Sequence, residues 1–404
     1  MRGQRQPIAV AAVDVGTSKV LAAIAVLEPD GLRVVGVGRV AADGVRRGAV
    51  VDLPAVAGAI RAAAERARRV AGRTLPPVTL GSAGGLLLSW NREAELEVDP
   101  PAELEPAHIS DLLAVVRAGT VPAGYQIVHA IAREFTVDGY EGCTQPVGMA
   151  AGRVGAHAHV VACQSTLLHN LWKAAGDAGL EVEDFAVAGL AAAEAVLTDE
   201  ERRQGALLLD IGAGASQVTA VIGGEAAAST VIGMGGGHVT ADIAVGLGLA
   251  VEAAEDVKQR HANADGGPGA DAVPDWLAAL RPGAEGTERA FCEIVTARAE
   301  ETVEAIARFV AEQGLEGRLP AGAVLTGGGS RLRGLPALVL RGLHLPVRCG
   351  GALGATGPLG APECAAVVGL MQFAAQRKSG GRRLPPVVQG AGASLRRWWP
   401  GARA

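Results

Sequence analysis

Two short segments of this 404-residue chain, DVGTSK at Asp14–Lys19 and DIGAGAS at Asp210–Ser216, place polar and small residues inside strongly apolar runs. Glycine permits a tight turn, and successive backbone N–H groups at such a turn can cradle a phosphate oxygen. An aspartate beside the turn can hold Mg²⁺ through water. One such turn alone also suits an ordinary structural hairpin. Two copies predict a phosphate site between two related halves of the chain.

Two further glycine runs strengthen this prediction. MGGGHVT contains Gly236 and Gly237 before an expected helix, and VLTGGGS places Gly327, Gly328 and Gly329 after an apolar strand, with a helix expected to open at Ser330. A glycine run there lets a flat base or ribose lie against the backbone, and a helix N-terminus favours phosphate. Either run alone would also suit a loop. Together the four segments predict ATP binding, with Mg²⁺ at Asp14 and Asp210.

Composition limits the class of protein. The length suggests two lobes, and 49% hydrophobic with only 3% aromatic residues favours α/β layers over a β-sandwich. A net charge of −5 gives no bulk reason to expect nucleic acid as a partner. Five widely spaced cysteines without a C-x-x-C pair indicate neither a disulfide framework nor a zinc site, so a reducing cytoplasm fits best.

The order of expected elements repeats. The second Asp-x-Gly hairpin begins about 196 residues after the first, which is the strongest internal signal of duplication. A helix should begin after Asp52, with Pro54 in its first turn, and end at Gly72. The expected parts are a first lobe at 8–77, an inserted small α/β subdomain at 78–162, a return to the first lobe at 163–204, a second lobe at 205–361, a closing helix at 362–378, and a linker with a tail at 379–404.

The four motifs resemble the actin/Hsp70/sugar-kinase ATPase superfamily. Segments such as QIVHAIAREFTVDGYEGCTQPVGMAAGRVGAHAHVV, AGLAAAEAVL and MGGGHVTADIAVGLGLAVEAAEDVKQ narrow the resemblance to the FtsA family of bacterial cell-division proteins, over nearly all of residues 8–377. The resemblance implies a duplicated actin-like (ribonuclease H-like) two-lobed ATPase fold. It also implies that the inserted α/β subdomain takes part in contacts between protomers.

The resemblance assigns residues to the nucleotide. They are Asp14, Gly16, Thr17, Ser18 and Lys19 in the first phosphate motif; Asp210, Gly212 and Gly214 in the second; Gly236 and Gly237 in the glycine turn; Glu255 and Lys258 at the nucleoside; and Gly327, Gly328, Gly329 and Ser330 in the adenosine motif. Without the family, Glu255 and Lys258 would be interpreted as an ordinary solvated helix pair.

The family also implies that the C-terminal peptide of the tubulin-like protein FtsZ docks on the lobe that contains an expected helix at 287–313. Arg298 and Glu301 fall at matching positions, although such charges on a long helix are commonly only solvated.

Two departures from the family pattern bear on hydrolysis. Ala215, Ser216 and Gln217 stand where the family has Thr-Thr-Asp after glycine, and Ala188-Gly189 stands where it has Glu-Pro. Both changes remove groups that could orient Mg²⁺ or an attacking water. The sequence therefore predicts ATP binding with weak or absent hydrolysis, and no catalytic residue is assigned.

The tail carries a separate signal. In ASLRRWWP, Leu395, Trp398 and Trp399 fall on one face of a short helix, with Arg396 and Arg397 toward the other side. Tryptophan prefers the headgroup interface, and arginine is attracted to anionic lipid. Pro400 limits the helix to about two turns, so one copy should bind weakly and need the avidity of a polymer. The alternative is a basic tail without a membrane role.

No uninterrupted apolar stretch approaches the roughly 20 residues that a spanning helix needs. The function expected from all these features is an ATP-binding, actin-like protein that polymerises on the cytoplasmic face of the membrane at the division site. There it would tether FtsZ filaments and contact other division proteins, with no nucleic acid partner. The alternatives are a pilus-assembly scaffold of the same fold and a small-molecule kinase, which would need a catalytic aspartate beyond Asp14 and Asp210.

Overall fold

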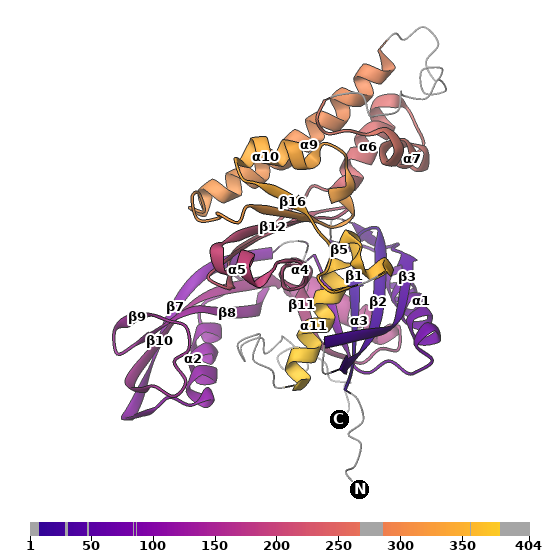
Figure 1. Cartoon of the computed structure of the whole chain (residues 1–404). Coiled ribbons are helices and arrows are strands. Elements are labelled where there is room, and N and C mark those ends of the chain that lie inside the picture. The colour runs from indigo at the N-terminus through magenta and orange to yellow at the C-terminus, as the bar shows by residue number, and fades with distance from the viewer. Residues whose placement is uncertain are drawn as a thin grey trace.

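A computed structural model describes residues 8–28, 31–46, 48–83, 85, 87–266, 286–355 and 357–379. The described residues contain two five-stranded sheets, one four-stranded sheet, one two-stranded sheet and the helices packed on them. In Figure 1 the second lobe, with α9 and α10, lies above the first lobe, and the four-stranded insertion extends to the lower left. The expected α/β architecture is confirmed.

The first lobe is built on the sheet order β11-β6-β1-β2-β3. Strands β1 to β3 form an antiparallel meander, while β6 pairs in parallel with both β1 and β11. Helices α1 and α3 contribute to the apolar core on one face of this sheet. The bounds are β1 Ala9–Val15, β2 Lys19–Glu28, β3 Gly31–Ala41, α1 Leu53–Ala71, β6 Val78–Ser82, α3 Ser165–Asp177 and β11 Val182–Val187; a short hairpin, β4 Val45–Arg46 and β5 Ala49–Val50, precedes α1.

The second lobe repeats this plan in the order β14-β13-β12-β15-β16. Its meander is again antiparallel, and β15 pairs in parallel with β12 and β16, so β14 corresponds to β3. The duplication expected from the sequence is present in the topology. The bounds are α5 Asp199–Gln204, β12 Ala206–Ile211, β13 Ser216–Ile222, β14 Glu225–Ile232, α6 Gly236–Leu247, α7 Val251–His261, α9 Thr287–Glu312, β15 Ala323–Thr326, α10 Leu335–Leu343 and β16 Val347–Cys349.

Two helices, α4 (Ala188–Val196) and α11 (Ala365–Ser379), share one apolar core with strands from both lobes. Their crossing is close: a Cβ added to Gly369 of α11 would lie 1.7 Å from the Ala191 carbonyl oxygen of α4. Only glycine fits there, and the alanines of α4 allow the same approach. Small residues thus explain how a chain so poor in aromatics closes its core.

The insertion is a sheet of order β7-β10-β8-β9 with α2 packed on it over its own apolar core. Three of its strands also contact β14 of the second lobe. The bounds are β7 Leu87–Glu103, α2 Pro106–Ala118, β8 Tyr125–Val137, β9 Tyr140–Cys143 and β10 Ala150–Gln164. The insertion is therefore attached to both lobes, because its chain ends enter the first lobe and its strands contact the second.

Local signals at helix ends were informative in one case and misleading in another. Asp52 accepts a hydrogen bond from the Ala55 N–H, and Gly72 ends α1 in the left-handed region, as the sequence predicted. The helix expected to open at Ser330 begins only at Leu335, as α10, and a single 3₁₀ turn, Gly328–Arg331, precedes it. Gly334, with φ of 76°, separates that turn from α10.

Among the described residues, no single helix has the length and hydropathy to cross a bilayer. The pair α6 and α7 passes that test only jointly, across a bend of 113°.

Glu225, at the start of β14, allows a test of the pH dependence of stability. Burial, followed by the charge of Glu194, raises the pKa of Glu225 to about 7, although Arg202 lowers it. The folded state therefore holds its proton more tightly than the unfolded state, and stability is lost as pH rises from about 4.5 to 7.

We expect Glu225→Gln to stabilise the protein at pH 8 by on the order of 2 kcal/mol and to have little effect near pH 5. Thermal unfolding at both pH values measures this, with the exposed Glu304→Gln as the control. An equal gain at both pH values would contradict the assignment.

Candidate functional site

A cavity of about 1170 Å³ opens between the lobes, and the sequence-predicted residues converge on it. All of the residues assigned to a nucleotide line it except Ser330, which is buried and donates its hydroxyl to the Gly327 carbonyl at 2.7 Å. Those that line it are Asp14, Gly16, Thr17, Ser18, Lys19, Asp210, Gly212, Gly214, Gly236, Gly237, Glu255, Lys258, Gly327, Gly328 and Gly329.

The two Asp-x-Gly turns have the same local geometry. The N–H of Gly16 donates to the Lys19 carbonyl at 3.0 Å, and the N–H of Gly212 donates to the Ala215 carbonyl at 2.9 Å. The turns also meet across the cavity, because a Cβ added to Gly214 would lie 2.6 Å from the Thr17 hydroxyl oxygen. The duplicated hairpins therefore form a clamp from two lobes. We call the turn at Asp14–Lys19 of the first lobe the first jaw and the turn at Asp210–Ser216 of the second lobe the second jaw.

The glycine turn before α6 is fixed to the second jaw. The N–H of Gly236 donates to the Gly212 carbonyl at 2.9 Å, and the N–H of Gly237 donates to the Ala213 carbonyl at 2.8 Å. The Ser216 hydroxyl donates to the Met234 carbonyl at 2.7 Å. These bonds hold the end of β14 and the start of α6 at the cavity wall.

Two buried carboxylates lie at the bases of the jaws, one in β1 and one in β12. Burial raises the pKa of Asp14 to about 6, against the lowering effect of Lys19. Burial, followed by the charge of Asp14, raises the pKa of Asp210 to about 7, and Lys19 again opposes it. Bringing a cation to this pair would relieve both the desolvation and the mutual repulsion.

The two carboxylates suit a hard cation that takes most of its ligands from water and phosphate. Among the described residues there is no group of three or more His, Cys, Asp or Glu side chains that could enclose a metal. Mg²⁺ commonly binds one or two carboxylates and completes its octahedron with water and phosphate oxygens. Asp14 and Asp210 fit that role, and the glycine-lined space leaves room for phosphates.

Lys19 and Lys258 are both partly committed to backbone groups. The Lys19 ammonium donates to the Glu363 carbonyl at 2.7 Å, which links the first jaw to the turn before α11. The Lys258 ammonium donates to the Gly236 carbonyl at 3.0 Å, the Thr240 hydroxyl at 2.8 Å and Glu255 at 2.7 Å. Glu255 and Lys258 therefore belong to a network that joins α7 to α6 at the cavity, rather than standing as a solvated pair.

Sequence reasoning missed a contact between the two segments, 188–189 and 215–217, that differ from the family pattern. The side-chain oxygen of Gln217 accepts the Gly189 N–H at 2.7 Å, and its amide nitrogen lies 3.3 Å from Asp210 Oδ2, to which it donates. A Cβ at position 189 would lie 2.8 Å from the Gln217 Cβ. The glycine and the glutamine are therefore mutually dependent, and the only sequence signal was that both positions depart from the same pattern.

Arg298 and Glu301 lie outside the cavity lining, on α9. The Arg298 side chain is 24% exposed, and its guanidinium pairs with Asp242 of α6 at 2.6 Å and with Glu301 at 2.5 Å. Hydrogen bonding to Asp242 raises the pKa of Arg298. This residue ties α9 to α6. The predicted membrane residues Leu395, Arg396, Arg397, Trp398 and Trp399 lie outside the described residues.

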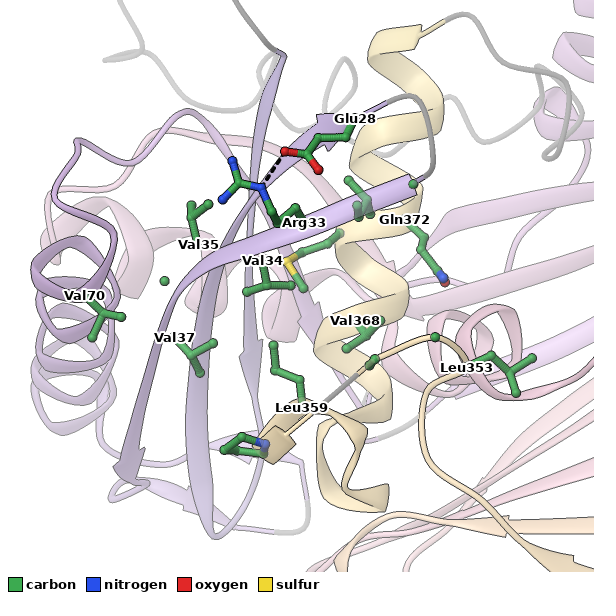
Figure 2. Close-up of a pocket in the computed structure, with 17 residues that line it drawn as sticks. Glu28, Arg33, Val34, Val35, Val37, Val70, Leu353, Leu359, Val368 and Gln372 are labelled. Atoms are coloured by element: carbon green, nitrogen blue, oxygen red, sulfur yellow. Dashed lines mark hydrogen bonds and ion pairs between the residues drawn. The ribbon is translucent and has the colours of Figure 1, made fainter.

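A second cavity of about 690 Å³ lies in the first lobe, between β3, α11 and the loop near Leu353 (Figure 2). Its wall is mostly aliphatic, with Val34, Val37 and Val368 among the side chains drawn, and an ion pair of Arg33 with Glu28 at its rim. Such an apolar wall offers few donors for phosphate. The interlobe cavity remains the candidate for a nucleotide.

Comparison with known proteins matches the chain to the description "Cell division protein FtsA" over residues 207–369 and to "SHS2 domain inserted in FTSA" over residues 84–162. The chain is 32% identical to the cell division protein FtsA of Pseudomonas aeruginosa over 377 residues, which cover 91% of this chain and 90% of that one. It is 29% identical to FtsA of Bacillus subtilis over 369 residues, which cover 90% of this chain and 82% of that one.

Solved structures share the fold at lower identity. The PilM–PilN type IV pilus biogenesis complex superposes with a TM-score of 0.63 and 19% identity, covering 90% of this chain and 98% of that one. MreB5 of Spiroplasma citri bound to ADP superposes with a TM-score of 0.54 and 13% sequence identity, over 93% of this chain and 99% of that one. The duplicated two-lobed fold is thus that of actin-like proteins.

The contact between the jaws can be tested with two glycines. Gly214→Ala would force a methyl group against Thr17 and hold the jaws apart, whereas Gly233→Ala adds a methyl group where no atom lies within 4 Å. We expect Gly214→Ala to weaken ATP binding by roughly tenfold or more, which corresponds to about 1.4 kcal/mol. Isothermal titration of both variants measures this. Equal affinities in the two variants would show that the jaws need not approach.

Proposed function

This chain belongs to the FtsA family of bacterial cell-division proteins, and we propose that it binds ATP between its lobes, self-associates and tethers FtsZ filaments to the membrane at the division site. The main support for ATP binding is the clamp formed by the two turns around the buried pair Asp14 and Asp210. The solved MreB5 structures, which contain ADP or AMPPNP, support nucleotide as the ligand of such a cavity.

Each lining group has a proposed role. Backbone N–H groups of the two jaws, with Thr17, Ser18 and Lys19, would bind the phosphates, while Asp14 and Asp210 would hold Mg²⁺ with water. Glu255 and Lys258 would contact the nucleoside from α7, and the glycines at 327–329 would let the base lie against the backbone. Because groups from both lobes contact one ligand, ATP would favour the closed arrangement of the lobes.

ATP would act mainly as a conformational ligand. Gln217 is a neutral amide that already accepts the Gly189 N–H and donates to Asp210. It therefore cannot take a proton from water, and Ala188 offers no acid in its place.

We expect the purified protein to bind ATP with Mg²⁺ yet release phosphate at no more than a few turnovers per hour, far below the roughly 1–10³ s⁻¹ of typical enzymes. A phosphate-release assay measures the rate, and Asp210→Asn, which should lose Mg²⁺-dependent binding, is the control. Brisk, Mg²⁺-dependent release by the unaltered chain would contradict the assignment.

Self-association is supported by the outer end of the insertion. Tyr140, Val147 and Met149 are exposed there, with Tyr140 at 80%. Exposed large apolar groups at one end of a subdomain are typical of a surface that another chain covers. We propose that this end of the insertion contacts a neighbouring protomer.

Membrane attachment is assigned to the tail on its sequence pattern of Leu395, Trp398 and Trp399 with two arginines. In the sequence the tail follows α11, whose described residues run to Ser379. FtsZ binding is assigned to the second lobe near Arg298 and Glu301 on family membership. Curated FtsA relatives in several bacteria favour this function over a pilus scaffold or a small-molecule kinase.

We expect the full chain to recruit FtsZ to anionic vesicles, and a chain lacking residues 379–404 to bind FtsZ but leave it in solution, because the tail supplies the lipid contact. Co-sedimentation with vesicles, with and without ATP, measures this. Neutral vesicles are the control, since they lack the charge that attracts Arg396 and Arg397. Unchanged lipid binding after truncation would refute the anchor, and failure to bind the FtsZ C-terminal peptide in either nucleotide state would refute the tether.

A further inference from the structure

Two strands that lead into the nucleotide cavity are both held by the insertion. In the second lobe, β14 runs from the insertion contact to the glycine turn at Gly235 on the cavity wall. In the first lobe, β11 ends at Val187, directly before Ala188, which also lines the cavity. Each strand is touched by one buried histidine of the insertion.

The contact with the second lobe is made by His159 of β10. Its side chain is 1% exposed, its Nε2 lies 2.9 Å from the Ser229 hydroxyl of β14, and its Nδ1 lies 3.0 Å from Asn91 Oδ1. Because the Asn91 oxygen can only accept, Nδ1 carries the proton and Nε2 accepts from Ser229. The Ser89 hydroxyl also donates to the Ser229 carbonyl. Strand β14 is thereby fixed by both its side chain and its backbone.

The contact with the first lobe is made by His129 of β8. Its side chain is 1% exposed, and its Nε2 accepts the Val187 N–H at 3.0 Å. Its ring lies 6.5 Å from the Phe373 ring of α11, with the planes tilted by 54°. Burial lowers the pKa of both histidines to about 3, so both are neutral connectors at physiological pH.

The cavity ends of the two strands are also fixed by hydrogen bonds. At the end of β14, the Met234 carbonyl accepts the Ser216 hydroxyl, and Gly236 bonds to the second jaw. Beyond β11, the Gly189 N–H donates to Gln217, the neighbour of Asp210. A movement of one lobe relative to the other therefore displaces the two points at which the insertion is held relative to each other.

We propose that His129 and His159 are positioning residues that make the insertion a bridge between the lobes, so that closure on a nucleotide reorients the insertion relative to its neighbours in a polymer. Because a buried polar group left unpaired is destabilising, the insertion follows the two strands rather than detaching from either. The proposal rests on the proposed function, because it assumes that the interlobe cavity binds ATP.

The experiment removes one hydroxyl from the bridge in the full chain. Ser229→Ala removes the hydroxyl that bonds His159 Nε2. Thr79→Val is the matched control, because the Thr79 hydroxyl is also buried and has no hydrogen-bond partner among the described residues. Hydrogen exchange of residues 87–164, ATP affinity by titration and self-association by sedimentation are measured with and without ATP. Ser89→Ala, which alters a partly exposed contact with β14, is the second variant in case Ser229→Ala fails to fold.

Coupled sites commonly change each other's equilibria by 5-fold or more. In the unaltered chain and in Thr79→Val, ATP is expected to change self-association by at least that factor and to alter exchange in β8 and β10. In Ser229→Ala, ATP affinity should stay within about threefold while the ATP-dependent change in self-association falls to less than twofold.

Retention of the full ATP response in both serine variants would overturn the bridge, as would an unaltered chain that binds ATP without any change in residues 87–164. An unaltered chain that does not bind ATP would instead overturn the proposed function.

Discussion

The structure depends on the burial of two carboxylates, Asp14 and Asp210, at the bases of two turns that face each other. Each carboxylate alone would lose solvation, and together they repel, so the ionised form of the pair is favoured only where the surroundings supply positive charge. Lys19 supplies part of it. The rest is available to a cation with its phosphate ligand, for which the glycines of the cavity wall leave room.

Small residues make this geometry possible. Gly214 lets one jaw reach Thr17 of the other, and Gly369 lets α11 rest on the Ala191 carbonyl in the core that both lobes share. A larger side chain at either place would separate elements that the carboxylate pair needs close together. The same requirement accounts for the composition, since an alanine-rich and glycine-rich core has little room for aromatic rings.

The sequence was sufficient where local chemistry decides structure. The two hairpins, the duplication and the cap at Asp52 follow from turn residues and apolar periodicity within short windows. The contacts that sequence could not supply are tertiary. Gln217 with Gly189 appeared only as two departures from a pattern, and His129 and His159 occur in alternating strands where nothing local separates them from ordinary core histidines. The helix expected to open at Ser330 is present but begins later, as α10 at Leu335, because glycines at 327 and 334 adopt positive φ and confine the segment between them to one 3₁₀ turn.

Duplication gave the two lobes equivalent outer strands, β3 and β14, and their sequences have diverged with their surroundings. Strand β3 carries Arg33 and Arg39 and borders the open cavity of Figure 2, and charged side chains are a common protection for an exposed strand at a sheet edge. Strand β14 has Glu225 at the position equivalent to Arg33 and Val231 at that of Arg39. Its alanines Ala226, Ala227 and Ala228 are buried, and the strand contacts the insertion. Since β14 continues into the glycine turn at the cavity, the insertion covers the outer strand that is fixed at its far end to the second jaw. Attachment to β3 would have left the insertion on a strand that returns only to the first jaw, and the second lobe would then move without it.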